Sequence, residues 1–221
     1  MRSTWPRRIV CATLWAGALA RADIIDRIAV SVGNRVITAS DLDREIRVIA
    51  FLDRAKGKPD FSPAGKRAAA ERMVEQKLIR RELETSRYPV PSAAEVEPVI
   101  EKFKKDYFPS DIEYRHALAD AGITEQDVKD ELLWQRTLLL FIGVRFRPGV
   151  QLTAQEIQDY FDKVVQPAAQ AAHPGQTVDI EDYRDQIEQK LTGQRVDQAV
   201  DTWLKEARRR TEIVFHEEVF Q

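Results

Sequence analysis

Apolar and polar positions alternate near the start of the chain and recur with helical spacing almost everywhere after it. In residues 24–37, Ile28, Val30 and Val32 alternate with smaller or polar residues, and Gly33-Asn34 interrupts the run, a pattern typical of a short β-hairpin. From about residue 38 to residue 210, apolar residues recur every three or four positions, which predicts helices. The expected helices span residues 41–54, 63–87, 93–107, 111–121, 125–146, 154–165 and 180–209.

Several of these helices begin with a hydroxyl residue that is followed three positions later by an acid. In such a capping box, the hydroxyl and the carboxylate each accept a hydrogen bond from an otherwise unpaired backbone amide. Gly122 stands where a left-handed residue would end one helix, and Ser62-Pro63 suits the start of another. The starts are Ser92 with Glu95, Ser110 with Glu113, Thr153 with Glu156, a looser Thr124 with Asp127, and Ser40 before Asp41.

The helix expected over residues 125–146 is the most apolar of the set. One face carries apolar residues at alternating spacings of four and three, interrupted by a single glutamine, and the second half is apolar nearly all round. We expect this helix in the centre of the fold, because helices that are apolar on several sides are usually buried. An exposed groove for an apolar partner is the alternative. The expected inner face consists of Val128, Leu132, Gln135, Leu139, Ile142 and Phe146.

Strand-forming residues return near the end of the chain, at Ile213-Val214-Phe215. A short strand at each end of a helical chain predicts that the two ends pair. We therefore expect a mainly α fold with a short N-terminal β-hairpin that is joined by a C-terminal strand. Residues 166–178, which are rich in alanine and contain a His-Pro-Gly turn, are expected to form a linker. This linker would join a helical core of residues 23–165 to a final helix and strand of residues 179–221.

Residues 1–22 have the pattern of a secretory signal peptide. Arg7 and Arg8 precede the apolar stretch 9–20, and the Ala-Arg-Ala that ends at Ala22 has the small-x-small pattern of a cleavage site. The apolar stretch is shorter than the ~20 residues of a membrane span. A buried N-terminal helix is the alternative, and the arginine pair leaves open whether export follows the Sec or the twin-arginine route. We expect cleavage after Ala22 and an exported protein, outside the cytoplasm, without stable membrane insertion.

The charge balance argues against nucleic acid as a partner. The chain of 221 residues carries 34 Lys and Arg against 36 Asp and Glu, and loss of residues 1–22 leaves 30 basic residues and a net charge of −6. A mildly acidic chain does not offer the basic surface that nucleic acids require. The single cysteine, Cys11, lies within the expected signal, so we expect neither a disulfide nor a thiolate nucleophile in the rest of the chain.

The sequence contains none of the common motifs for hydrolases, metalloproteases or phosphate loops. His116, His173 and His216 are far apart in the sequence, although a fold could gather them as metal ligands. The cluster Arg208-Arg209-Arg210 closes the last long helix, and favourable interaction with the helix C-terminus is sufficient to explain it. We expect no enzymatic activity and no cofactor or metal.

The order of these segments resembles that of the SurA-type periplasmic chaperones. The opening strand, Gly-Asn turn, second strand and Ser-Asp helix start are similar to the beginning of that family. Later segments are similar to its following helices, to the stretch before its parvulin-type prolyl isomerase domain, and to its returning C-terminal helix and strand. The resemblance implies a SurA/trigger-factor-like peptide-binding core. It is carried by residues 25–43, 73–79, 90–96, 122–133, 152–157 and 183–213.

One departure from the family pattern bears on activity. SurA-type chaperones usually carry one or two isomerase domains between the two halves of the core, but here only residues 164–176 separate the halves. This stretch is too short for a parvulin domain and does not supply its catalytic residues. We therefore expect the peptide-binding core without prolyl isomerase activity.

The expected function is an ATP-independent chaperone that holds unfolded exported polypeptides, with outer-membrane protein precursors as the expected clients. An exported helical subunit that assembles with one dedicated partner is the alternative, because an apolar surface would serve either role. Apolar and aromatic side chains would line the client-binding crevice, although their spacing favours core positions over binding positions for each of them. The candidate binding residues are Phe51, Phe103, Tyr107, Phe108 and Phe141.

Overall fold

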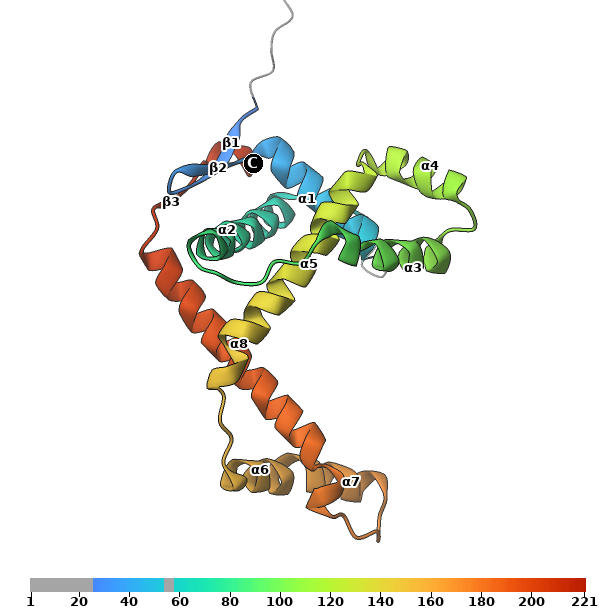
Figure 1. Cartoon of the computed structure of the whole chain (residues 1–221), viewed down its shortest axis with the longest axis vertical. Helices are drawn as coiled ribbons and strands as arrows, with labels where there is room; N and C mark the ends of the chain where they lie inside the picture. Colours follow the sequence, from blue (N-terminus) through green and yellow to red (C-terminus); the bar gives the residue numbers. More distant parts are fainter. Residues whose placement is uncertain (1–25, 54–57) are drawn as a thin grey trace, which may run out of the picture.

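The structure, a computed structural model, describes residues 26–53 and 58–221 (Figure 1). The expected signal peptide and its cleavage point after Ala22 lie outside these residues. The described chain is mainly helical with one small antiparallel sheet, as the sequence predicts. The strands are β1 (Ile28–Val32), β2 (Arg35–Thr38) and β3 (Ile213–Phe215). The α-helices are α1 (Ala39–Leu52), α2 (Pro63–Thr85), α3 (Glu97–Tyr107), α4 (Asp111–Ala121), α5 (Glu125–Arg145), α6 (Ala154–Tyr160), α7 (Gln166–Ala172) and α8 (Arg184–Arg209).

The sheet joins the two ends of the described chain. Its strand order is β2-β1-β3, and β1 is antiparallel to both neighbours. Val32 pairs with Arg35 on one side and with Ile213 on the other. Gly33 adopts a positive φ of 58° in the hairpin turn, and its N–H donates to the carbonyl of Glu212 at 2.8 Å. The expected hairpin and the expected pairing of the chain ends are both confirmed.

The inner face of the sheet packs against α1 and α2. Val30 and Ile37 are fully buried there, beside Leu42 of α1 and Val74 of α2. Phe220, close to the end of the chain, completes this apolar cluster. The core therefore depends on residues from both ends of the chain, and neither end can bury its apolar side chains alone.

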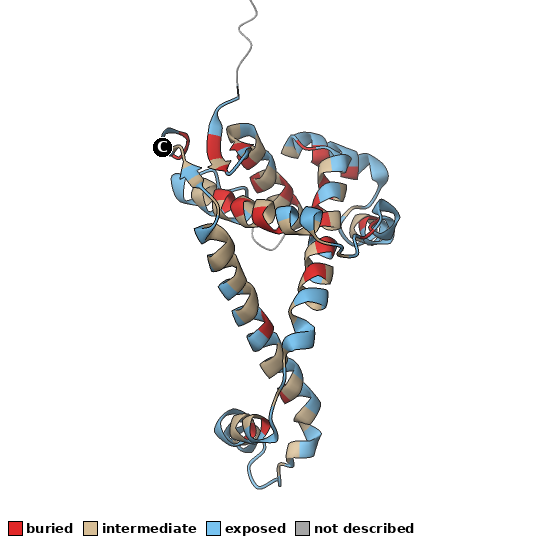
Figure 2. Ribbon diagram, turned by 60° about the vertical axis from the view of Figure 1, so that its left-hand side comes forward, coloured by how far each residue is buried: buried red, intermediate tan, exposed pale blue. Residues whose placement is uncertain are grey.

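Two parts of the structure extend away from this sheet core. We call residues 97–121, which comprise α3, α4 and their connection, the arm; it projects from the side of α5 (Figure 1). We call α6, α7 and the first half of α8 the distal lobe, and Ile157, Phe161 and Ile187 form its small core. Buried residues are dense around the sheet, α1, α2 and the first half of α5, and they are sparse in the distal lobe (Figure 2).

Helix α8 connects the distal lobe to the sheet. Its first half packs against α6, and farther along Trp203 and Leu204 contact the second half of α5. Near its end, Arg208 donates to Glu71 at 2.8 Å and to Glu75 at 3.1 Å, both on α2. Helix α8 thereby contacts the distal lobe, the second half of α5 and helix α2, and fixes their relative positions.

The inner face of α5 matches the expected one only in part. Val128 is buried, and Leu132, Ile142 and Phe146 pack against core clusters, as expected. Leu139 is 71% exposed, whereas Glu131 and Thr137 are buried. The helix carries two overlapping apolar stripes, and its neighbours decide which one is covered. Arg80 of α2 lies over the ring of Trp134 at 4.3 Å from the ring centroid, which turns the Trp134 side of α5 toward α2. The observed inner face consists of Val128, Glu131, Trp134, Thr137 and Phe141.

The prediction that residues 166–178 form a linker was wrong for their first half, which is helix α7. Alanine is a strong helix former, and Pro167 stands at the start of α7, where its missing N–H costs little. A π-helical turn, Phe161–Val165, precedes α7, and the N–H of Gln166 donates five residues back to Phe161. The widened turn lets a proline follow without breaking the helix.

The start of α1 also differs from the prediction. Thr38, rather than Ser40, caps α1, and Thr38 forms a full capping box with Asp41. Ser40 instead lies inside the first turn of α1, where its backbone N–H and its hydroxyl both donate to Asp26. Thr124 with Asp127 also forms a full box, and Gly122 has the expected left-handed conformation, with φ of 65°.

The junction of α1, α2 and α5 contains a group of charges in which Glu131 is buried, Glu45 is half-buried and the two arginines are exposed. Glu45 comes from α1, Arg72 and Arg80 from α2, and Glu131 from α5. Burial raises the pKa of Glu131 to about 7, even though Gln135 donates to its carboxylate at 2.9 Å, and the nearby Glu45 adds to the rise. Burial also raises the pKa of Glu45. Both carboxyl groups therefore favour the protonated form more than they do in water.

This junction predicts that the fold loses stability as pH rises through neutrality. The folded chain holds a proton on Glu131 at pH values where the unfolded chain does not, so the free energy of unfolding falls between about pH 5 and pH 8, by about 2–3 kcal/mol. Urea unfolding across this range measures the slope. Glu131→Gln should flatten the slope, and the exposed Glu113→Gln should leave it unchanged. A slope that survives Glu131→Gln would assign the pH dependence to other groups.

Candidate functional site

Five aromatic rings meet where α1 contacts the arm. Phe51 lies 5.8 Å from Phe103 and 5.9 Å from Phe108, measured between ring centroids, and Phe108 lies 5.1 Å from Tyr114. Tyr107 extends the group, at 5.1 Å from Phe103. We call these five residues the aromatic cluster. The Phe51–Phe108 pair is stacked and the others are tilted or edge-on, and pairs of these kinds stabilise a cluster beyond the burial of apolar area alone.

The aromatic cluster contains four of the five candidate binding residues named from the sequence. Phe51 is buried, Phe103 and Phe108 are half-buried, and Tyr107 is 53% exposed. The fifth candidate, Phe141, lies on α5 away from the cluster. It is 1% exposed and packs against Trp203 at 5.6 Å. The assignment of Phe141 to a binding crevice is therefore wrong, because the side chain is fully enclosed where α5 and α8 cross.

An apolar stripe leads from the aromatic cluster to the surface of α3. Val99, Phe103 and Tyr107 are spaced four residues apart, so they lie on one face of the helix. Val99 is 47% exposed, and Ile112, at the start of α4, is also exposed. A buried aromatic core and an exposed apolar surface are thus continuous on the arm.

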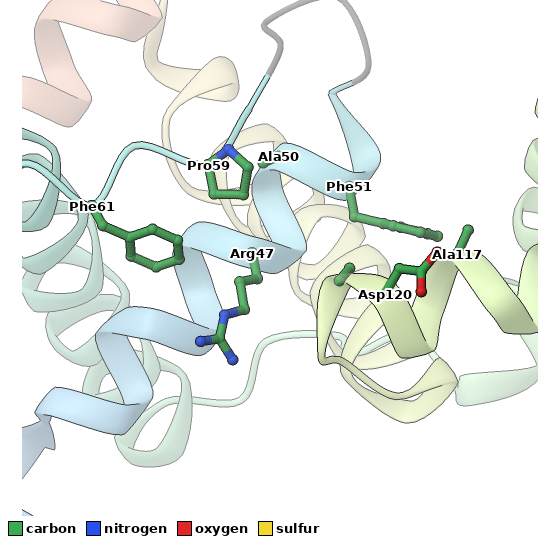
Figure 3. A pocket seen from close by; sticks show the side chains of 8 residues that line it. Arg47, Ala50, Phe51, Pro59, Phe61, Ala117 and Asp120 are labelled. Carbon is green, nitrogen blue, oxygen red and sulfur yellow. The ribbon is translucent and has the colours of Figure 1, made fainter.

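A groove lies between α1 and α4, with a volume of about 540 Å³ (Figure 3). We call it the α1–α4 groove. Phe51 forms part of its wall, so the groove adjoins the aromatic cluster. Phe61 lines the other side, and the guanidinium carbon of Arg47 lies 5.6 Å from the centre of its ring. Arg47 and Asp120 bring one charge of each sign to a lining that is otherwise mostly alanine, proline and phenylalanine.

Ion pairs surround the apolar parts of the arm. Lys104 donates to Glu101 at 3.1 Å and lies 3.5 Å from Glu125. Burial lowers the pKa of Lys104, but these two carboxylates outweigh it and raise the pKa overall. Lys129 on α5 donates to Glu97 of α3 at 2.8 Å. These pairs keep the rim charged around the apolar surface.

The hydroxyl of Tyr114 is buried in the aromatic cluster and has no hydrogen-bond partner among the described residues. Burial raises the pKa of Tyr114 to about 12, and the charges of Glu125 and Glu101 add to the rise. The Nζ of Lys104 lies 5.0 Å from the centre of the Tyr114 ring and interacts with its face. The ring of Tyr114 therefore stabilises the cluster, whereas its buried hydroxyl, which has lost its hydrogen bonds to water, destabilises it.

Several residues of this site were not identified from the sequence. Val99 could have been found, because it stands four residues before Phe103 and eight before Tyr107. Arg47 and Phe61 could not, because α1 and the segment before α2 meet only in the tertiary structure. They lie on segments separated by the end of α1, so no repeat within one helix or strand relates them.

The described residues offer no metal centre. No group of three or more His, Cys, Asp or Glu side chains gathers within residues 26–53 and 58–221. His116 lies on α4, His173 follows α7, and His216 lies within hydrogen-bond distance of Ser31 of β1. Among the helices of this part of the chain, none has the length and apolar character that a membrane span requires.

The comparisons with known proteins do not assign a function to the chain. No protein-family model matches the chain, and no curated protein matches it in sequence.

The position of Phe141 predicts a stability effect rather than a binding effect. Phe141→Ala should lower the free energy of unfolding by about 3–5 kcal/mol, because it empties a fully enclosed site. Leu139→Ala on the exposed side of the same helix should change it by less than about 0.5 kcal/mol. Equal effects of the two substitutions in denaturant unfolding would contradict the burial of Phe141 and the exposure of Leu139.

The unpaired hydroxyl of Tyr114 predicts a stabilising substitution. Tyr114→Phe should raise the free energy of unfolding by about 1 kcal/mol, because it removes a buried polar atom and keeps the ring. Tyr160→Phe in the distal lobe, where the residue is only half-buried, is the control and should change little. A loss of stability in Tyr114→Phe would mean that the hydroxyl has a partner.

Proposed function

We propose that the chain is an ATP-independent chaperone that holds unfolded exported polypeptides on the arm and the α1–α4 groove. The observation that carries this proposal is the continuity of the buried aromatic cluster with the exposed stripe of Val99, Phe103 and Tyr107. Exposed apolar residues on an otherwise solvated surface mark binding sites for apolar partners.

The geometry suits a weak and sequence-tolerant partner. The groove is open and has few polar groups, so it favours apolar side chains without selecting one by a hydrogen-bond pattern. The aromatic rings offer rigid faces for client side chains, and aromatic residues contribute most to interfaces of this kind. The ion pairs at the rim would keep the complex soluble.

We further propose that the chain is a SurA-type core without an isomerase domain, that it is periplasmic, and that its clients include precursors of outer-membrane proteins. The pairing of the opening hairpin with the C-terminal strand supports this architecture. Between α5 and α8 the chain contains only the short elements of the distal lobe, which leaves no room for a separate isomerase domain.

Client binding tests the proposal directly. A denatured outer-membrane protein is diluted into buffer with the purified chain, and its aggregation is followed by light scattering without ATP. We expect suppression at near-stoichiometric ratios for this client and for an unrelated unfolded protein. Suppression of neither would contradict a holding chaperone, and binding restricted to one envelope protein would favour the dedicated-partner alternative.

The surface of the arm predicts which variants lose this activity. Val99→Ser with Tyr107→Ser should weaken client binding roughly tenfold, because it removes the exposed part of the apolar stripe. Leu139→Ser is the matched control, since it removes an exposed apolar side chain from another surface. Fluorescence anisotropy with a labelled unfolded client measures the affinities, and circular dichroism checks the fold. Equal losses in both variants would contradict binding at the arm.

A further inference from the structure

A second pocket of the molecule, on a different set of helices from the groove, is rich in arginine. It has a volume of about 360 Å³ and lies between the C-terminal halves of α2, α5 and α8. Arg81, Arg145 and Arg210 line it, one from each helix or its end, and Glu82 is the single acid of the lining. We call it the arginine pocket. Three arginine side chains thus line one pocket in a chain whose formal net charge is −2.

The three arginines differ in how far they are already neutralised. Arg145 donates to Glu82 at 2.9 Å and to the hydroxyl of Tyr88 at 2.6 Å, so it is held by the fold. Arg210 donates only to the backbone carbonyl of Glu206, at 3.4 Å, and within the described chain neither Arg210 nor Arg81 forms an ion pair. Two exposed guanidinium groups therefore keep most of their donors for another partner.

The apolar side of the arginine pocket is rigid. Leu78, Trp203 and Ala207 contribute it, and the ring of Trp203 is held by Phe141 at 5.6 Å. The guanidinium carbon of Arg145 lies 5.5 Å from the centre of the Trp203 ring. A ligand that fits this pocket combines an apolar part with an anionic end.

The structure also divides the three consecutive arginines at the end of α8. Arg208 pairs with Glu71 and Glu75 of α2, and Arg209 pairs with Glu206. Arg210 is the member that lines the pocket. Interaction with the helix C-terminus, which the sequence alone favoured, is seen for Arg210, whose guanidinium donates to the carbonyl of Glu206, but it does not account for the pairs of Arg208 with α2.

We propose that the arginine pocket binds a carboxylate of the client polypeptide, with the apolar side chain next to it packed on Trp203. This inference rests on the proposed function and adds a charge-selective contact to it. Arg81 and Arg210 would hold the carboxylate oxygens, since guanidinium groups match a carboxylate in shape and charge. The carboxylate is either the C-terminus of the client or an acidic side chain beside an apolar residue.

Three labelled peptides separate these sources of the carboxylate. One is a short apolar peptide that ends in phenylalanine with a free C-terminus, the second is its C-terminal amide, and the third is the amide with an aspartate before the phenylalanine. We expect the first or the third peptide, or both, to bind about tenfold more tightly than the plain amide in anisotropy measurements. Preference for the first identifies the C-terminus, and preference for the third identifies the side chain.

Variants of the exposed arginines complete the test. Arg81→Gln and Arg210→Gln should each remove most of this preference while the plain amide binds as before. Arg209→Gln is the matched control, because Arg209 is the neighbour of Arg210 but does not line the pocket. Equal binding of all three peptides to the native chain overturns the carboxylate site alone. Binding of none of them, together with no suppression of aggregation, overturns the proposed function as well.

Discussion

The pairing of β1 with both β2 and β3 is the contact on which the rest of the structure depends. β2 follows β1 after a two-residue turn, but β3 arrives from the far end of the chain. The helices between β1 and β3 must therefore bring the two ends of the chain together before β3 can pair with β1. Once it closes, Val30 and Ile37 are covered by α1, α2 and the last residues of the chain, which gives the sheet core its full burial. Helix α8 must then end at the sheet, and this requirement positions the distal lobe at its other end.

Stability and binding make opposite demands on the arm. A buried aromatic group is needed to attach α3 and α4 to α1, and the same group continues into apolar residues that water reaches, such as Val99 and Tyr107. Leaving these residues exposed forgoes the stabilisation that their burial would bring. The neighbouring ion pairs of Lys104 and Lys129 limit the apolar area to a narrow stripe. Such an arrangement favours a partner that contributes its own apolar side chains.

Much of the fold was predictable because its signals are local. Helix starts follow from a hydroxyl and an acid three residues apart, and the hairpin follows from alternation and the Gly33 turn. The covered face of α5 was predictable only in part, because two apolar stripes overlap on it and Leu139, a member of the expected stripe, faces solvent. The candidate site was predictable only in part, because apolar periodicity identifies aromatic residues but not their surroundings. Aromatic residues on α1 and α3 could be named, but periodicity does not tell which of them are enclosed, as Phe141 shows.

The sequence by itself determined the mainly helical class, the positions of most helices and the pairing of the two chain ends. The helical class and the helix positions depend on propensity, capping and apolar periodicity, which act over a few residues, whereas the pairing of the ends was inferred from a short strand pattern at each end. Only the tertiary structure decided which apolar residues remain exposed, where the α1–α4 groove opens, and that three arginines from separate helices share a pocket. Those properties depend on distances between residues far apart in the chain, and such distances exist only after the helices have packed.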